Sequence, residues 1–175
     1  MRRFTSGFCI VIGVVLCFFL NTTFFTRVNI NGIRPDAIIA FCVTIGVLLG
    51  GYRAAVSGVI VGLIIDIVFE KYIGLNAIAY LLAGVAGGYF YRKFYADNVI
   101  IPALTALVIT LVKEHIFFIA YVLSGGKGGY FHMFIGYMIP CALLTAGICV
   151  LFRLILKPLL RQELDRQSEK RMNNE

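Results

Sequence analysis

Apolar residues along the chain form six long stretches, and most of the charged side chains lie outside them, in the connecting segments and at the two ends of the chain. Each stretch contains 17 to 25 residues, the length that an α-helix needs to cross the hydrocarbon core of a bilayer. The pattern therefore predicts an all-α integral membrane protein, a six-helix transmembrane bundle over residues 1–157 followed by a basic tail over 158–175. The six predicted spans cover residues 4–25, 35–51, 54–70, 74–91, 99–123 and 133–156.

Two of these spans leave room for another interpretation. The second span would extend only about 25 Å as a helix, and it is joined to the third by a minimal link, so the two could form a tilted or incompletely crossing hairpin. The first span follows a short basic start and resembles a signal peptide. Its apolar run is long, however, and Asn21-Thr22-Thr23 is not a small-x-small cleavage site, so we interpret it as a retained helix.

Composition excludes several classes of protein. Hydrophobic residues make up 60% and charged residues 14% of the 175 positions, with a mean hydropathy of +0.90, whereas globular domains have about 45–50% apolar and about 25% charged residues. The chain has too little charge to cover a water-facing surface. A soluble enzyme, a disordered tail and a secreted disulfide scaffold are therefore excluded. The segments without any Lys, Arg, Asp or Glu are 4–26, 37–52, 72–91 and 128–152.

Basic residues are distributed unevenly between the two sides of the predicted bundle. With Arg2 and Arg3 in the cytoplasm, eleven of the sixteen Lys and Arg residues fall on that side, including Arg53 and those of the tail. Four fall on the opposite side, and Lys113 lies within a span. This bias predicts that both termini are cytoplasmic. Most of the net charge of +7 comes from these basic residues, which set the orientation of the chain in the membrane. We therefore expect no nucleic-acid partner.

Polar residues inside the predicted spans gather toward the outer side. Asp66 lies 13 residues after Arg53 and Lys113 lies 15 residues after Asn98, which places both at about 20 Å from the cytoplasmic side. We therefore predict an Asp66–Lys113 ion pair. Ionisable groups in a membrane are costly and indicate function by default. The outer polar cluster comprises Arg34, Asp36, Asp66, Asn76, Lys113, Glu114 and His115.

Three interpretations of the outer polar cluster are open. It can be an internal ion-pair network that neutralises itself and fixes helix packing, an outward-opening polar pocket or partner-docking site, or a catalytic centre. Glu114-His115 is not an HExxH motif, and no Ser or Cys nucleophile has a plausible His base nearby. The five cysteines lie inside apolar runs and form no CxxC pair, as expected for packing residues. We expect no catalytic, metal or cofactor site.

Glycine pairs at GxxxG spacing occur in three consecutive spans. Small residues at this spacing allow helix backbones to approach closely in membranes. In the third span the glycine stripe continues at the same spacing to Asp66. We expect these residues to serve mainly packing within the chain, with docking of a partner helix as the alternative. The predicted partner or packing residues are Gly46, Gly50, Gly58, Gly62, Asp66, Gly84 and Gly88.

The central third of the chain resembles the rod shape-determining protein MreD family of bacteria. Three segments carry the resemblance: Arg34-Pro35-Asp36 opening an apolar span, Gly58 and Gly62 leading to Asp66 at a helix end, and Gly74-Leu75-Asn76-Ala77 opening the next helix. The family pattern has three parts in chain order. They are RPD or RPN, a helix with two glycines at GxxxG spacing that ends in a Leu-Asp-like pair, and LG-x-x-AL. Here Ile65 replaces the usual Leu before the aspartate, and Ile78 replaces the Leu after Ala77.

The resemblance implies a function that no spacing in the sequence establishes. MreD-like proteins are non-enzymatic, multi-pass components of the bacterial cytoplasmic membrane. They associate with the bitopic protein MreC and, through it, with the actin-like MreB, the glycosyltransferase RodA and its transpeptidase partner, a class B penicillin-binding protein. They support side-wall peptidoglycan synthesis in the elongation complex, and hence rod shape. The resemblance also implies that the lipid bilayer surrounds the protein and contacts its helices.

The family is also thought to resemble the substrate-binding components of energy-coupling-factor transporters in fold. That likeness supplies the alternative function, a substrate-binding subunit of a vitamin transporter of this kind. The outer polar cluster is compatible with either function. A transporter subunit is expected to co-purify with an ATPase module and a tightly held ligand, whereas a scaffold is expected to co-purify with an MreC-like chain.

Overall fold

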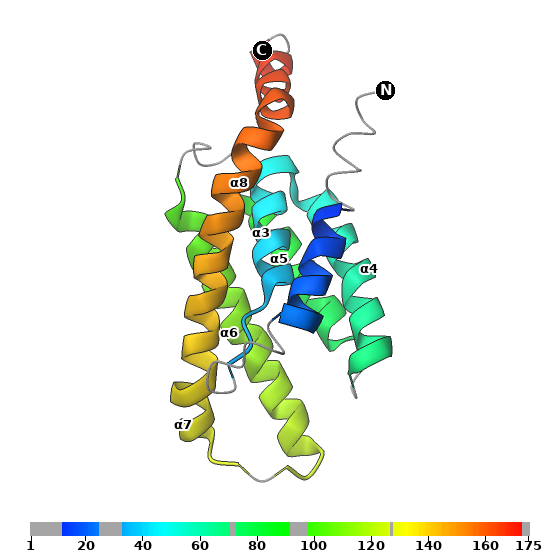
Figure 1. Ribbon diagram of the computed structural model, residues 1–175, viewed down its shortest axis with the longest axis vertical. Coiled ribbons are helices and arrows are strands. Elements are labelled where there is room, and N and C mark those ends of the chain that lie inside the picture. The colour runs from blue at the N-terminus through cyan, green and yellow to red at the C-terminus, as the bar shows by residue number, and fades with distance from the viewer. Residues whose placement is uncertain (1–11, 25–32, 71–72, 92–97, 127, 173–175) are drawn as a thin grey trace.

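The regular secondary structure of the protein is helical throughout the part of the chain that the computed structural model describes (Figure 1). The described residues are 12–24, 33–70, 73–91, 98–126 and 128–172, the last fourteen of them as helix backbone only. In chain order the elements are an apolar helix Ile12–Thr23 ending in the π-helical turn η1 (Leu20–Phe24), α3 (Ala37–Leu49), α4 (Gly51–Phe69), α5 (Leu75–Phe90), α6 (Ile100–Leu123), α7 (Tyr130–Met133), η2 (Phe134–Met138) and α8 (Ile139–Met172).

Three of these helices are long and apolar enough to cross a membrane. They are Gly51–Phe69, Ile100–Leu123 and the continuous helix Tyr130–Pro158, which includes α7, η2 and the first part of α8. The other apolar helices, Ile12–Thr23, Ala37–Leu49 and Leu75–Phe90, are shorter. The described part of the chain is thus all-helical, with helices apolar enough to cross a membrane, as the apolar pattern predicts. The N-terminal part of the predicted first span, residues 4–11, lies outside the described residues.

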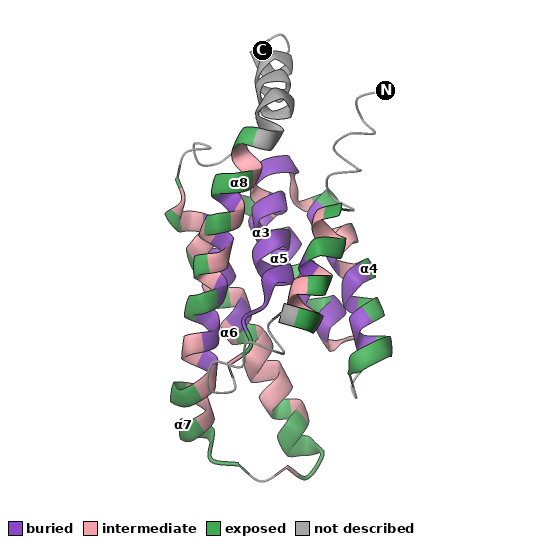
Figure 2. Cartoon of the chain, in the orientation of Figure 1, coloured by how far each residue is buried: buried purple, intermediate pink, exposed green. Residues whose placement is uncertain are grey.

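Helix α3 occupies the centre of the bundle. Every residue from Ala37 to Leu49 except Val47 is buried (Figure 2), because α3 packs against α4, α5, α6 and α8. Its 13 residues extend only about 20 Å. A helix that is apolar on all sides and enclosed by other helices belongs to a protein core. The short second apolar stretch of the sequence is therefore the core helix of the bundle.

The helices around α3 expose apolar side chains on their outer sides. Ile67 of α4 is 70% exposed and Ile100 of α6 is 74% exposed. Large exposed apolar surface is rare on soluble monomers and indicates contact with lipid or with a partner. The outer surface thus agrees with the composition of the chain, which has few charged residues to cover it.

Helix α5 lies against α4 at very short distance because glycines remove the side chains between them. A Cβ atom added at Gly62 would lie 2.4 Å from the Cα of Ala77, and one at Gly58 would lie 2.7 Å from the Tyr80 carbonyl oxygen. On α5, a Cβ at Gly88 would lie 2.2 Å from the Cα of Gly51. Backbone atoms occupy these positions, so no side chain fits there without moving a helix.

The same helix α5 also packs against α3 through small residues. A Cβ at Gly46 of α3 would lie 2.8 Å from the carbonyl oxygen of Gly84. Gly50 has a different role from the packing that its GxxxG spacing predicts. It is the single residue between α3 and α4, its φ is +100°, and a Cβ there would approach only the Tyr91 ring, at 3.6 Å. Gly50 therefore allows the sharp turn that reverses the chain.

Candidate functional site

Asp36 begins the central helix and is buried at that end of the bundle. Its side chain is the N-cap of α3 and accepts hydrogen bonds from the backbone N–H groups of Ile38 and Ile39, at 3.0 and 3.2 Å. Such a cap satisfies N–H groups that have no partner within the helix. Only 4% of Asp36 is exposed, so these bonds also offset the loss of water around the carboxylate.

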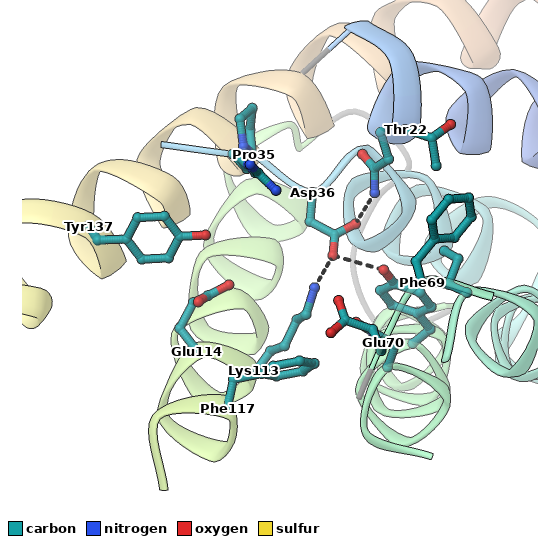
Figure 3. Close-up of a pocket in the computed structure, with 14 residues that line it drawn as sticks. Thr22, Pro35, Asp36, Phe69, Glu70, Lys113, Glu114, Phe117 and Tyr137 are labelled. Carbon is teal, nitrogen blue, oxygen red and sulfur yellow. Dashed lines mark hydrogen bonds and ion pairs between the residues drawn. The ribbon is translucent and has the colours of Figure 1, made fainter. Parts of the chain in front are cut away.

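The Asp36 carboxylate joins α3 to three other helical segments. Asn21 of η1 donates a hydrogen bond to one carboxylate oxygen at 3.0 Å. The Tyr80 hydroxyl of α5 donates to the other at 3.0 Å, and the Lys113 ammonium of α6 forms an ion pair with that same oxygen (Figure 3). On α8, Thr145 accepts a hydrogen bond from the Asp36 backbone N–H at 3.0 Å. One aspartate thus holds together five helical segments of the chain.

Lys113 is enclosed by aromatic rings in addition to its ion pair. Its nitrogen lies 5.4 Å from the centroid of the Tyr80 ring and 5.4 Å from that of Phe117, within the range of cation–π attraction. Its side chain is 13% exposed. A lysine inside the bundle is therefore stabilised by a full negative charge and by two ring faces, as intramembrane cations require.

Asp66 is the second buried carboxylate, and it caps α5 from the neighbouring helix. Its oxygens accept hydrogen bonds from the backbone N–H groups of Gly74, Asn76 and Ala77 at 2.8, 3.2 and 3.2 Å, and from the Asn76 side-chain amide at 2.9 Å. Gly74 is the N-cap residue of α5, with φ +101° and no side chain to act as a cap. Asp66 supplies the missing acceptor, and its negative charge also suits the positive end of the helix dipole.

The predicted Asp66–Lys113 ion pair was wrong. Lys113 pairs with Asp36 instead, and Asp66 is 0% exposed among the first residues of α5. The two side chains were matched by their depth along their helices, but depth does not determine the direction in which a side chain points. The carboxylate of Asp66 accepts hydrogen bonds from the N–H groups at the start of α5. Lys113 pairs with Asp36, at the start of the central helix α3.

Replacing Asp66 by alanine should lower the free energy of unfolding by about 3 kcal/mol, because several buried N–H groups would lose their acceptor and each costs about 1–3 kcal/mol. Asp66→Asn keeps one carbonyl oxygen in place and should lose less. The unfolding midpoint in a titration with sodium dodecyl sulfate, followed by circular dichroism, measures both variants. An alanine variant that unfolds at the wild-type midpoint would contradict this capping role.

A cavity of about 440 Å³ lies beside Asp36. In Figure 3, Lys113 and Glu114 extend from α6 toward it, Tyr137 points its hydroxyl into it from η2, and Glu70 lies across from Tyr137. The described residues that line it are Asn21, Thr22, Arg34, Pro35, Asp36, Ile65, Phe69, Glu70, Asn76, Tyr80, Lys113, Glu114, Phe117 and Tyr137.

Most of the predicted outer polar cluster meets at this cavity. Arg34, Asp36, Asn76, Lys113 and Glu114 line it, and Asp66 lies next to it through its bond to Asn76. A larger set of lining residues was missed by the sequence interpretation, namely Asn21, Thr22, Pro35, Ile65, Phe69, Glu70, Tyr80, Phe117 and Tyr137.

His115 belongs to a different group of residues from the outer polar cluster to which it was assigned. It does not line the cavity. Its ring bonds to the Tyr130 hydroxyl at 2.6 Å and to the Leu111 carbonyl oxygen at 2.8 Å, and it packs edge-on against Phe134. Neighbouring residues on a helix point about 100° apart, so Glu114 and His115 point in different directions. His115 instead joins the C-terminal half of α6 to α7.

Within the described ranges, no group of three or more His, Cys, Asp or Glu residues could hold a metal ion. Four buried cysteines, Cys17, Cys42, Cys141 and Cys149, carry free thiols. The Cys141 thiol donates to the Arg34 carbonyl oxygen at 3.1 Å, which fixes the segment before α3 against α8.

Comparison with known families gives a match over most of the chain. The family model described as rod shape-determining protein MreD matches residues 1–163. Comparisons with curated proteins and with solved structures found no significant match. The matched residues include both buried carboxylates, the glycines between α4 and α5, and the whole lining of the cavity. This membrane protein belongs to the rod shape-determining protein MreD family.

Proposed function

We propose that the chain is a non-enzymatic scaffold component of the bacterial elongation complex, where it supports side-wall peptidoglycan synthesis and rod shape. The observation that carries this proposal is the match of the MreD family model to residues 1–163. The proposed direct partner is an MreC-like bitopic protein, with MreB, RodA and a class B penicillin-binding protein reached through it.

The geometry of the buried charges supports a scaffold. Asp36 and Asp66 use their oxygens for helix caps and for bonds between helices. An acid or base in catalysis must instead have a reacting group within reach. The buried charges of this chain fix the relative positions of its helices, which is what a protein that presents a defined surface to partners requires.

We further propose a six-span, multi-pass arrangement in the cytoplasmic membrane, with a transmembrane domain over 1–157, a basic tail over 158–175 and both termini in the cytoplasm. Arg53 follows the α3–α4 turn, and that turn lies at the same end of the bundle as the C-terminal part of α8, drawn in red in Figure 1. Basic residues concentrated at one end favour that end as cytoplasmic.

Affinity purification of the full-length chain, tagged at its C-terminus and extracted in mild detergent, tests the proposed function. We expect mass spectrometry to find an MreC-like bitopic chain enriched at least tenfold over a control, an unrelated multi-pass protein with the same tag. Depletion of the protein should also convert rod-shaped cells to rounded ones. Absence of any MreC-like chain, together with unchanged cell shape on depletion, would refute the scaffold function.

The cavity favours one second candidate, a substrate-binding subunit of an energy-coupling-factor vitamin transporter. Its volume of about 440 Å³ falls in the range of small-molecule sites, about 300–1,000 Å³. The same purification separates the two functions, because a transporter subunit should bring down an ATPase module and a bound water-soluble vitamin.

A further inference from the structure

The charged residues around the cavity do not balance. Lys113 and Asp36 neutralise each other. The remaining charged side chains among the described lining residues are Arg34, Glu70 and Glu114, so these described residues carry an excess of negative charge. In the described part of the chain, neither glutamate side chain makes a hydrogen bond or an ion pair. An occupant that carries a cationic group would complement these two carboxylates.

The positions of the two glutamates suit a small cationic group that carries several hydrogen-bond donors. Glu70 lies at the end of α4 and Glu114 on α6, and in Figure 3 their carboxylates extend into the space around Lys113 from different helices. Phe117 and Tyr137 place aromatic rings beside the same space. An ammonium group donates three hydrogen bonds and is attracted to ring faces, so carboxylates and rings together form a suitable environment for it.

The edge of the cavity is apolar, which points to an amphiphile rather than a water-soluble cation. Phe69 lines the cavity and is also 57% exposed, and the preceding residues Ile67 and Val68 of α4 are 70% and 61% exposed. The cavity therefore opens beside an apolar outer surface. A molecule with a polar head in the cavity and hydrocarbon chains along α4 would cover both.

We propose that the cavity binds the headgroup of a phospholipid with a primary ammonium, as in phosphatidylethanolamine. The ammonium donates to the carboxylates of Glu70 and Glu114, and the phosphate lies toward Arg34, the exposed cation of the lining. The acyl chains follow the apolar surface of α4. A zwitterionic head of this kind matches the two glutamates and one arginine better than an anionic head, which would bring a second negative charge to an already negative cavity.

Native mass spectrometry of the purified full-length protein tests the proposal with defined lipids. The protein is delipidated, reconstituted in nanodiscs of equimolar phosphatidylethanolamine, phosphatidylcholine and phosphatidylglycerol, and released in the instrument. Phosphatidylethanolamine should be retained at least fivefold over each of the others. Phosphatidylcholine is the informative comparison, because its quaternary ammonium has the same charge but no N–H donor. Soluble glycerophosphoethanolamine, added in tenfold excess over the lipid, should not displace it.

Matched variants test whether the retention of phosphatidylethanolamine depends on the two glutamates of the cavity. Glu70→Gln/Glu114→Gln keeps the side-chain volumes and should reduce the preference to less than twofold, whereas Glu163→Gln/Glu169→Gln removes the same charge from the end of α8 and should keep the full preference. Gel filtration and circular dichroism verify that both variants fold. Because the readout is lipid retention, failure here leaves the scaffold function and its purification test unaffected. Equal retention of the three lipids, displacement by the soluble headgroup, or full preference in the cavity variant would overturn the proposal.

Discussion

Replacing Asp36 by alanine should lower the free energy of unfolding by about 4 kcal/mol. The change removes the N-cap of the central helix and the acceptor of Asn21, Tyr80 and Lys113. Removal of one partner from a buried ion pair costs about 3–5 kcal/mol, because the other charge stays buried without compensation. Steric trapping in bicelles measures the free energy of unfolding.

Glu114→Ala is the matched control for Asp36→Ala. Glu114 also places a carboxylate at the cavity, and within the described residues its side chain has no hydrogen bond that the substitution would break. We expect it to change the free energy of unfolding by less than about 1 kcal/mol. Similar losses for the two substitutions would show that the Asp36 contacts carry no special stability.

Replacing Gly84 by alanine should lower the free energy of unfolding by about 3 kcal/mol and reduce the amount of folded protein in the membrane. The new Cβ atom would lie 2.4 Å from the backbone nitrogen of Ala55 and 2.6 Å from the carbonyl carbon of Ala54. Since both are backbone atoms, the clash is relieved only by moving α4 away from α5, and overpacking of this kind costs about 1–3 kcal/mol or more.

Gly147→Ala provides the comparison for Gly84→Ala. Gly147 lies in α8, and nothing would lie within 4 Å of a Cβ added there. Alanine is a better helix former than glycine by about 1 kcal/mol, so this variant should be as stable as the wild type or slightly more stable. Equal losses for the two substitutions would mean that close contact between α4 and α5 does not determine stability.

The helices themselves could be predicted from the sequence because lipid imposes a simple length rule. The predicted span 74–91 corresponds to α5 (Leu75–Phe90), and the predicted span 99–123 corresponds to α6 (Ile100–Leu123). The predicted span 54–70 began three residues late, since α4 starts at Gly51, directly after the Gly50 turn. Hydrophobicity reports which residues are apolar, but it does not report which helix is enclosed, so the central position of α3 could not be predicted.

The residues of the cavity could be predicted only as a set, and not in their pairing. The sequence gives the depth of Asp66 and Lys113 but not their azimuth around the bundle, which depends on how the helices pack. One signal for the true role of Asp66 was present, because Gly74-Leu75-Asn76 starts a helix without a capping side chain. Asn21 and Tyr80 were missed as partners of Asp36 because both belong to apolar helices, where a single polar residue has no pattern of its own.

A pair of double-mutant cycles tests most directly the claim that Lys113 pairs with Asp36 and not with Asp66. One cycle combines Asp36→Ala with Lys113→Ala, and the other combines Asp66→Ala with Lys113→Ala. We expect a coupling energy of about 2 kcal/mol for the first, above the average of about 0.6 kcal/mol for polar pairs between membrane helices. The second should be additive within about 0.5 kcal/mol, because Asp66 and Lys113 share no bonded partner. Additivity in the Asp36–Lys113 cycle, or strong coupling in the Asp66–Lys113 cycle, would contradict the account.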